Sequence, residues 1–407
     1  MVILYYLCVI FFGQKSIYIS YFIMKVLSLF NNKGGVGKTT LTYHLAHILA
    51  TSVAEGGCGK KVLLMDLDPQ SNLTIFSIQE ETIREIWDAE KPFMDMKQSF
   101  QAAKEQLSEE AFSALLHTTR TLHFLLKPTE EGISDEDILP PPFHLNEEKT
   151  LGIIPGRSSL YKYETSITQR WSATYIGVPL SLRTITKIRN IAQMYAEKYG
   201  YDYVIMDTSP SLDMLNKVVI SMADGFIIPC FPDLFSLYGI RNIGESLKAW
   251  ESEFTTMNYI LSSEQRKDFP KRFVQFLGYT IFNAPKHEGK NAWNLSQAHY
   301  HYAQLFPQVI KNNILVPKPL PDEVISLPIG ETVVMHSHNI FPSQAQKYKV
   351  PMWELPMLET ELGEDFSMIK ENQLQYLELK KDYYNFAENL LERIKYLEVE
   401  TLELVAR

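Results

Sequence analysis

The chain has 407 residues, of which 45% are hydrophobic and 21% are charged, a composition typical of a globular protein with a sizeable core. Its 39 basic and 48 acidic residues give a net charge of −9, which argues against a uniformly basic nucleic-acid-binding protein but allows a local basic patch. Three scattered cysteines, Cys8, Cys58 and Cys230, indicate neither a disulfide framework nor a structural zinc site. This usage fits a reducing cytosol, and we expect a cytoplasmic protein.

The first 23 residues are almost wholly apolar apart from Gln14-Lys15-Ser16. The run from Met1 to Phe12 is shorter than the roughly 20 residues that span a bilayer. It also differs from a signal peptide, which has a basic start and a small-residue cleavage site. Two interpretations stay open: a mis-set translation start, with Met24 as the true first residue, and a genuine membrane-associating leader.

A glycine-rich loop follows the first predicted strand. The apolar run 26–30 has the character of a buried strand, and residues 41–49 have the character of a helix. The loop between them contains three glycines, Gly34, Gly35 and Gly37. Glycines let the backbone curl so that successive N–H groups point inward, and the helix N-terminus adds partial positive charge, so the loop predicts a nucleotide phosphate site. Lys38 would reach the β- and γ-phosphates, and the Thr39 hydroxyl would join a Mg²⁺ shell.

Strand and helix patterns alternate along the rest of the chain. Further apolar runs predict buried strands at 60–66, 151–156, 203–207, 225–230 and 276–283. Helical spacing predicts helices over 98–116, 182–199 and 367–405. This alternation predicts an α/β fold with a doubly wound, mostly parallel sheet, which binds ligands at the carboxyl ends of its strands.

We expect the chain to be divided into an apolar leader at 1–23, an ATPase domain at 24–366 with an insertion at about 73–150, and a C-terminal helix at 367–407. The last part is acidic, with eleven acidic and six basic residues from position 360 onward. A helical stripe there, supported by Leu374, Leu390 and Leu397, consists of Leu377, Tyr384, Ala387, Leu391 and Ile394. The stripe favours a helix packed on the domain, and a free partner-binding helix stays open as the alternative.

Three aspartates follow two of the predicted strands. Asp66 and Asp68 come at the end of one strand, where their side chains point in opposite directions, and Asp207 ends another. Phosphoryl transfer to water needs charge neutralisation and a positioned nucleophile. We assign Asp68 to orienting the attacking water, Asp66 to the water shell of the metal, and Asp207 to Mg²⁺ through a water. A structural capping role is the alternative for each of them.

The segment Lys33-Gly34-Gly35-Val36-Gly37-Lys38-Thr39-Thr40 resembles the deviant phosphate-binding loop, or Walker A motif, of the ParA/MinD family of ATPases. The likeness is nearest to the ParA-type ATPases of chromosome and plasmid partitioning. It implies that all eight residues contact the nucleotide. It also implies that the extra lysine, Lys33, acts in trans, so that ATP is enclosed between the two subunits of a homodimer.

Other motifs extend this resemblance from about Met24 to Asn283, and more weakly to about Pro356. The segments 66–70 and 207–211 are similar to the family's two aspartate motifs. The proline-containing strand end at 228–240 resembles a family segment near the dimer seam and the base, which implies a base contact for Pro232. Asn283 resembles the asparagine that binds the adenine ring, and a turn residue is the alternative.

The resemblance implies a switch ATPase that hydrolyses ATP to ADP and phosphate. No arginine finger is evident, so intrinsic turnover should be slow, because that charge is worth about 10³–10⁵ in rate. We therefore expect an ATP-bound dimer that a small partner protein triggers to hydrolyse. The insertion at about 73–150 is longer than usual in the family, and the acidic end after Ser367 also departs from it.

Three outputs of the switch stay open. The first is DNA partitioning, in which the ATP-bound dimer binds DNA nonspecifically and is associated with the nucleoid. Candidate DNA contacts are Arg266, Lys267, Lys271, Arg272, Lys286 and Lys290, which could equally be a solvated charged loop. The second is MinD-like membrane positioning, which requires a basic amphipathic C-terminal helix. Because the C-terminal part is acidic, this output is disfavoured unless residues 1–23 are a genuine leader that anchors the protein. The third is a partner-regulated signalling or assembly module of a mobile element or defence system.

Overall fold

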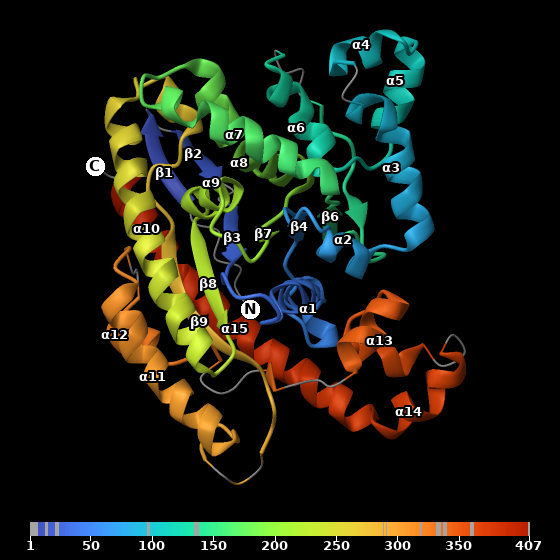
Figure 1. Ribbon diagram of the computed structural model, residues 1–407, viewed down its shortest axis with the longest axis vertical. Coiled ribbons are helices and arrows are strands. Elements are labelled where there is room, and N and C mark those ends of the chain that lie inside the picture. The colour runs from blue at the N-terminus through green and yellow to red at the C-terminus, as the bar shows by residue number, and fades with distance from the viewer. Residues whose placement is uncertain are drawn as a thin grey trace.

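The computed structural model describes residues 7–12, 15–20, 24–95, 98–133, 138–287, 289, 291–317, 320–330, 335–336, 340–358 and 362–405. Within these residues an eight-stranded sheet has the strand order β10-β9-β8-β3-β7-β4-β6-β5. Its strands are β3 (Lys25–Leu29), β4 (Val62–Asp66), β5 (Phe143–His144), β6 (Leu151–Ile154), β7 (Tyr203–Asp207), β8 (Gly225–Cys230), β9 (Gln275–Ala284) and β10 (Met335–His336). Helices cover both faces of this sheet (Figure 1).

The pairing within the sheet brings the predicted site together. Neighbouring strands are parallel, except that β5 runs antiparallel to β6. Leu29 and Asp66 are both in register with Asp207, so β3, β4 and β7 end at the same edge. The central strands are buried along their length because helices pack on both sides. The predicted α/β, doubly wound, mostly parallel fold is therefore confirmed.

The helices between the strands follow the predicted alternation. The N-terminal and insertion helices are α1 (Lys38–Ala50), α2 (Asn72–Ser77), α3 (Glu80–Met94), α4 (Phe100–Glu105), α5 (Glu109–Leu116) and α6 (Leu122–Glu131). The central ones are α7 (Tyr161–Thr174), α8 (Pro179–Tyr199), α9 (Met214–Met222) and α10 (Leu234–Ile260). The remainder are α11 (Gln297–Asn313), α12 (Asp322–Ile325), α13 (Phe341–Tyr348), α14 (Phe366–Glu371) and α15 (Gln373–Val405), with short 3₁₀ turns η3 (Gln265–Asp268) and η4 (Met352–Met357).

The apolar N-terminal segment forms two strands, β1 (Leu7–Phe12) and β2 (Lys15–Ser20). They pair antiparallel with one another as a separate two-stranded sheet. Among the described residues, no helix combines the length and the apolar character that crossing a membrane requires. Both interpretations of residues 1–23 stay open.

The expected insertion contains α3 to α6, and here one sequence prediction is wrong. The helix predicted over 98–116 is broken into α4 and α5, because Ser108 begins a new helix by accepting a hydrogen bond from the Ala111 N–H at 3.2 Å. The helices share a small aromatic core made by Phe93, Phe100, Phe112 and Phe124. A serine cap thus outweighs a continuous apolar pattern.

The C-terminal segment is also two helices, α14 and α15, rather than one. The long helix α15 packs against α1 and η4, and its Tyr383, Phe386 and Leu390 side chains are buried. Of the predicted stripe and its supporting residues, Ala387, Leu390, Ile394 and Leu397 are buried as expected, whereas Leu377 is 45% exposed and Leu374 76% exposed, so the stripe is buried only in the C-terminal half of its length. This packing favours the interpretation of α15 as part of the domain.

Candidate nucleotide site

The glycine loop joins β3 to α1 at the carboxyl edge of the sheet. Gly37 precedes α1 with a φ of 79°, and Gly35 has a φ of 72°, both in the left-handed region that favours glycine. A Cβ atom on Gly37 would lie 2.0 Å from Cε1 of Phe282 on β9, so this position is closed to other residues for a second reason. A Cβ on Gly34 or Gly35 would meet no atom within 4 Å, so the space beside the loop is open to a ligand.

The Lys38 side chain folds back over the loop. Its ammonium donates to the backbone oxygen of Asn31 at 3.1 Å and lies 3.5 Å from that of Lys33. Burial lowers the pKa of Lys38, and the charges of Asp207 and Asp68 partly offset this effect. Among the described residues no carboxylate pairs directly with this buried cation, an arrangement that is favourable for an anionic phosphate, so the geometry fits the role predicted for Lys38.

Thr39 and Asp207 come together as predicted. The Thr39 hydroxyl donates to Oδ2 of Asp207 at 2.7 Å, and the Thr42 hydroxyl lies 3.3 Å from Oδ1. Burial raises the pKa of Asp207 to about 6, although the Thr39 hydrogen bond and the Lys38 charge act in the opposite direction. A hydroxyl and a carboxylate beside the loop are oxygen ligands of the kind that Mg²⁺ prefers.

Asp66 lies beside Asp207 but faces away from the open space. Its Oδ2 accepts from the Thr74 N–H at 2.8 Å and the Thr74 hydroxyl at 2.6 Å, and its Oδ1 accepts from the Asp68 N–H at 3.1 Å. Burial raises the pKa of Asp66 to about 7, and the nearby Asp207 charge adds to the shift. These contacts match the structural alternative for Asp66, and its metal role stays a prediction.

Asp68 follows β4 and organises the next turn. Its Oδ1 accepts from the Gln70 N–H at 2.9 Å, and its Oδ2 accepts from the Asn72 side-chain amide at 2.8 Å. The side chain is buried, and its charge acts on Lys38 and on Asp207. Asp68 is therefore positioned at the site, and its carboxylate is held by two donors that fix its orientation.

Lys33 points to its own subunit in this structure. Its ammonium forms an ion pair with Oδ2 of Asp233 at 2.6 Å. It also lies 5.0 Å from the ring centre of Phe231 and 5.7 Å from that of Phe235. Burial alone would raise the pKa of Asp233, but the Lys33 ammonium and the Ser236 N–H hold it below its ordinary value. Lys33 remains 27% exposed, so it lies at the mouth of the site rather than inside it.

Two asparagines lie before the loop: Asn32 was expected at the site, whereas Asn31 was not. The Asn31 amide donates to the backbone oxygen of Pro229 at 2.7 Å, which joins the loop to β8. Asn32, which stands where a standard loop has glycine, packs on α10: a Cβ on Gly239 would lie 2.8 Å from its Oδ1. A strand-end asparagine is too common to signal such a role by itself, and Asp233 and Phe282 carried no signal either.

The predicted base contacts are placed less fully. Pro232 is buried directly before α10, close in sequence to Asp233 and therefore to Lys33. Asn283 lies on β9 next to Phe282, which packs on Gly37, but the Asn283 side chain lies outside the described part of the structure. Both positions are thus near the loop, and their roles stay predictions.

The described residues beside the loop supply enough ligands for Mg²⁺ only if a nucleotide phosphate also coordinates the ion. No group of three or more histidine, cysteine, aspartate or glutamate side chains that could hold a metal occurs among the described residues. Mg²⁺ commonly takes one or two protein oxygens together with waters and substrate phosphates. Thr39 and Asp207 supply that small set.

The predicted DNA contacts are split between two edges of the sheet. Arg266, Lys267, Lys271 and Arg272 precede β9, whereas Lys286 follows it, and Lys290 lies outside the described residues. The ten residues of β9 separate the two groups by about 33 Å. Lys267 pairs with Glu264 at 2.8 Å and Arg272 donates to the Leu397 backbone oxygen, so the five described residues do not form a single patch.

A parallel sheet with a glycine loop, a buried lysine and a threonine–aspartate pair defines a P-loop ATPase. Residues 24–259 match a family model described as an AAA domain, which covers more than half of the chain. The chain therefore belongs to this family, and within it to the ParA/MinD-type P-loop ATPases.

Named relatives agree with this assignment. The chain is 23% identical over 232 residues to the sporulation initiation inhibitor protein Soj of Bacillus subtilis, with 57% of this chain and 68% of Soj covered. It is 24% identical over 230 residues to the chromosome partitioning protein ParA of Caulobacter vibrioides, with 55% and 62% covered. The chain spans about half to two thirds of the length of the curated relatives it matches.

Solved structures show the same fold. The structure of pNOB8 ParA superimposes with a TM-score of 0.53 at 20% identity, covering 92% of this chain and 99% of that one. A protein from Corynebacterium diphtheriae gives a TM-score of 0.51 at 25% identity, covering 71% and 89%.

Proposed function

We propose that this protein is an ATP-dependent dimerising switch that hydrolyses ATP to ADP and phosphate. The observation that carries the proposal is the Lys38, Thr39 and Asp207 arrangement beside an open glycine loop. Backbone N–H groups of residues 33–40 and the Lys38 ammonium would bind the phosphates. Bound Mg²⁺ would neutralise the phosphate charge, with Thr39 and Asp207 as its protein contacts and Asp66 behind them.

Asp68 is the proposed water-positioning residue. Two donors fix its carboxylate, so its orientation does not have to be established during the reaction. Because no arginine finger is evident in the sequence, turnover of the isolated protein should be slow until a small partner protein stimulates it. Pro232 and Asn283 are the proposed contacts to the base.

A second copy of the chain would complete the site. The first turns of α10 expose large apolar side chains beside Lys33: Leu234 is 47% exposed, Phe235 72% and Tyr238 54%. An apolar surface of this kind commonly marks a protein interface. Lys33 would leave Asp233 and reach the nucleotide of the partner, so the ion pair seen here belongs to the uncomplexed state.

DNA partitioning is the proposed output. Two of the relatives are named as a chromosome partitioning protein and a sporulation initiation inhibitor, and the fold is shared with pNOB8 ParA. The ATP-bound dimer would bind DNA nonspecifically in the cytoplasm, in association with the nucleoid. Of the candidate contacts, Lys271 is exposed at the amino edge of the sheet and Lys286 at the carboxyl edge.

The test is retention of labelled duplex DNA on a filter, with Mg²⁺ and ATP, ADP or no nucleotide. We expect retention only with ATP, decreasing steeply between 50 and 200 mM salt, by about 10³-fold if six phosphates are contacted. Lys38→Ala should abolish it, and Lys104→Ala on the insertion should not. If no DNA is retained at low salt with ATP although ATP still drives dimerisation, the proposed DNA binding is refuted and the proposed ATP-dependent switch is not.

A further inference from the structure

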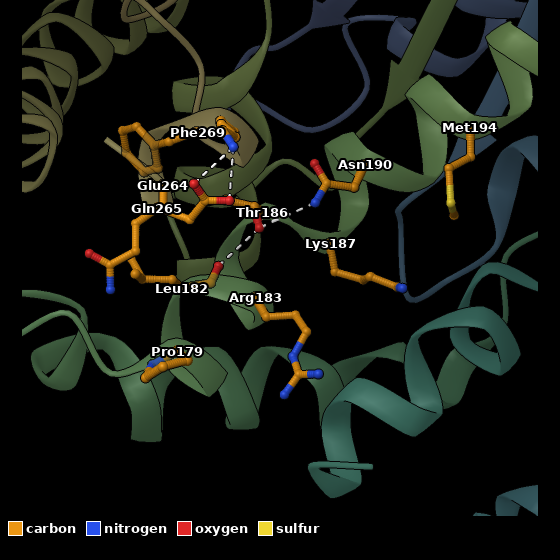
Figure 2. Close-up of a pocket in the computed structure, with 11 residues that line it drawn as sticks. Pro179, Leu182, Arg183, Thr186, Lys187, Asn190, Met194, Glu264, Gln265 and Phe269 are labelled. Atoms are coloured by element: carbon orange, nitrogen blue, oxygen red, sulfur yellow. Dashed lines mark hydrogen bonds and ion pairs between the residues drawn. The ribbon is translucent and has the colours of Figure 1, made fainter. Parts of the chain in front are cut away.

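A groove lies along α8 (Figure 2). Its cavity has a volume of about 500 Å³. One wall is a single face of α8, formed by Pro179, Leu182, Arg183, Thr186, Asn190 and Met194. The other wall comes from the segment after α10, with Glu264, Gln265 and Phe269. None of the loop, Asp66–Asp68 or Asp207 residues lines it.

The groove lies toward the amino ends of the strands. Arg189, on the same helix, donates to Oδ1 of Asp224 at 2.8 Å, and Asp224 immediately precedes β8. Oδ2 of Asp224 accepts from the Val26 N–H near the start of β3. Since the nucleotide loop follows the carboxyl end of β3, the groove and the nucleotide site lie at opposite edges of the sheet.

The shape of the groove suits an extended chain. Pro179 and Met194 are fifteen residues apart on α8, a length of about 22 Å at the rise of an α-helix. An extended peptide of about seven residues has the same length. Leu182 and Phe269 give the groove apolar walls, which are suited to apolar side chains of a ligand.

The lining charge is mainly positive. The lining includes three basic side chains, those of Arg183, Lys187 and Lys267, and one carboxylate, that of Glu264. Glu264 is already paired with Lys267 at 2.8 Å. Within the described residues Arg183 makes no hydrogen bond or ion pair, and it is half-buried in the groove wall. A guanidinium in this position is suited to bind a carboxylate by two parallel hydrogen bonds.

Two large apolar side chains near the Pro179 end of the groove are exposed to solvent. Ile176 is 80% exposed and Tyr259 is 85% exposed. The Gln265 amide holds this end together by donating to the Gly177 backbone oxygen at 2.9 Å, and Arg266 donates to the Tyr259 backbone oxygen at 3.1 Å. Large exposed apolar groups next to a cationic groove indicate a protein-binding surface rather than ordinary solvent-exposed surface.

We propose that this groove binds an extended acidic peptide of a partner protein, with alternating carboxylate and apolar side chains. Duplex DNA fits it poorly, because Lys187 is only 8% exposed and a phosphate backbone requires cations at the surface. The proposal is independent of the proposed ATPase function, since the groove shares no residue with the nucleotide site.

The test is selection from a random heptapeptide library displayed on phage, with the full chain as bait. We expect enrichment of peptides that combine Asp or Glu with Leu or Phe. Synthetic copies should bind the wild type and bind Arg183→Glu about tenfold more weakly or worse. Lys198→Glu, the same charge change at an exposed position of α8 outside the groove, should bind as the wild type does.

Asn190→Trp fills the groove without changing its charge, and it should also weaken binding. For each variant, an ATP-dependent mass increase in light scattering shows that the chain is folded and that its nucleotide switch still works. Peptide binding is then measured separately. The proposal would be overturned if basic or neutral peptides were enriched, or if the peptides bound Arg183→Glu as tightly as the wild type. It would also be overturned if a labelled oligonucleotide bound the wild type and the control variant but not Arg183→Glu.

Discussion

At the scale of single residues, the site is defined by where each polar group finds its partner. Lys38, Thr39 and Asp207 meet as the motifs predicted, because neighbouring parallel strands end at one edge. Asp66 shows the limit of that argument, since a strand-end aspartate can equally cap the next helix turn. The sequence cannot tell which oxygen faces a ligand, and the Thr74 hydrogen bonds decide it here.

Asp68→Ala tests the water-positioning role. We expect ATP to bind with nearly unchanged affinity, while hydrolysis falls by about 10²-fold or more, the usual contribution of a positioned proton-accepting group. Phosphate release and binding of a fluorescent ATP analogue measure the two separately. Asp88→Ala, an exposed position on α3, is the matched control. Normal hydrolysis by Asp68→Ala would show that another group positions the water.

Asp66→Asn tests the electrostatics of the buried pair. Burial raises the pKa of Asp66 from 3.8 to about 7, so between about pH 4 and pH 7 the folded chain keeps a proton that the unfolded chain has lost. This contribution to stability is fully present below pH 4 and is lost as pH rises through 7. Asparagine does not titrate, so the variant lacks this pH dependence. The difference in melting temperature between the nucleotide-free variant and the wild type should therefore be more favourable to the variant at pH 8 than at pH 5. An equal difference at both would contradict the raised pKa.

At the scale of elements, the strands were predicted closely and the helices less so. Buried parallel strands are short continuous apolar runs, and their ends are marked by polar residues. The insertion helix over 98–116 was wrong because a serine cap at Ser108 outweighs periodicity. The buried face of α15 was predicted correctly at Ala387, Leu390 and Ile394 but not at Leu374 and Leu377, because a helix with apolar residues on several sides gives no unique stripe.

His44 joins the nucleotide helix to the C-terminal part of the chain. Its Nδ1 lies 2.7 Å from the Thr40 backbone oxygen, and its Nε2 accepts from the Met352 N–H at 3.2 Å. Both contacts fix a neutral ring with the proton on Nδ1, and burial lowers the pKa of His44 to about 3.

His44→Ala should therefore destabilise the whole domain, by about 3 kcal/mol from two lost hydrogen bonds and a cavity. Chemical denaturation measures the effect, and His301→Ala on the exposed face of α11 is the control. A variant as stable as the wild type would mean that η4 and α15 are held to α1 by other contacts.

At the scale of the whole molecule, the surface around Lys33 has two states. In the uncomplexed chain Lys33 pairs with Asp233, and in the proposed dimer it serves the partner's nucleotide. Both side chains of this pair are partly exposed, so the bond is worth no more than about 1 kcal/mol. Dimerisation can therefore break it readily.

Asp233→Asn should release Lys33 while keeping an acceptor for the Ser236 N–H at the start of α10. We expect the dissociation constant of the ATP-dependent dimer to be up to about fivefold lower than that of the wild type, because about 1 kcal/mol no longer has to be spent on breaking the ion pair. Sedimentation over a range of protein concentrations with ATP and Mg²⁺ measures this constant. A weaker dimer would show that Asp233 serves the interface instead of competing with it.

The most direct test of the central claim is the mass of the Asp68→Ala protein in solution, by light scattering with Mg²⁺ and ATP. The account predicts the mass of two chains with ATP and of one chain with ADP, and the mass of one chain throughout when Lys33→Ala is added, although that protein still binds ATP. A single-chain mass for Asp68→Ala with saturating ATP, or a dimer that persists without Lys33, would contradict it.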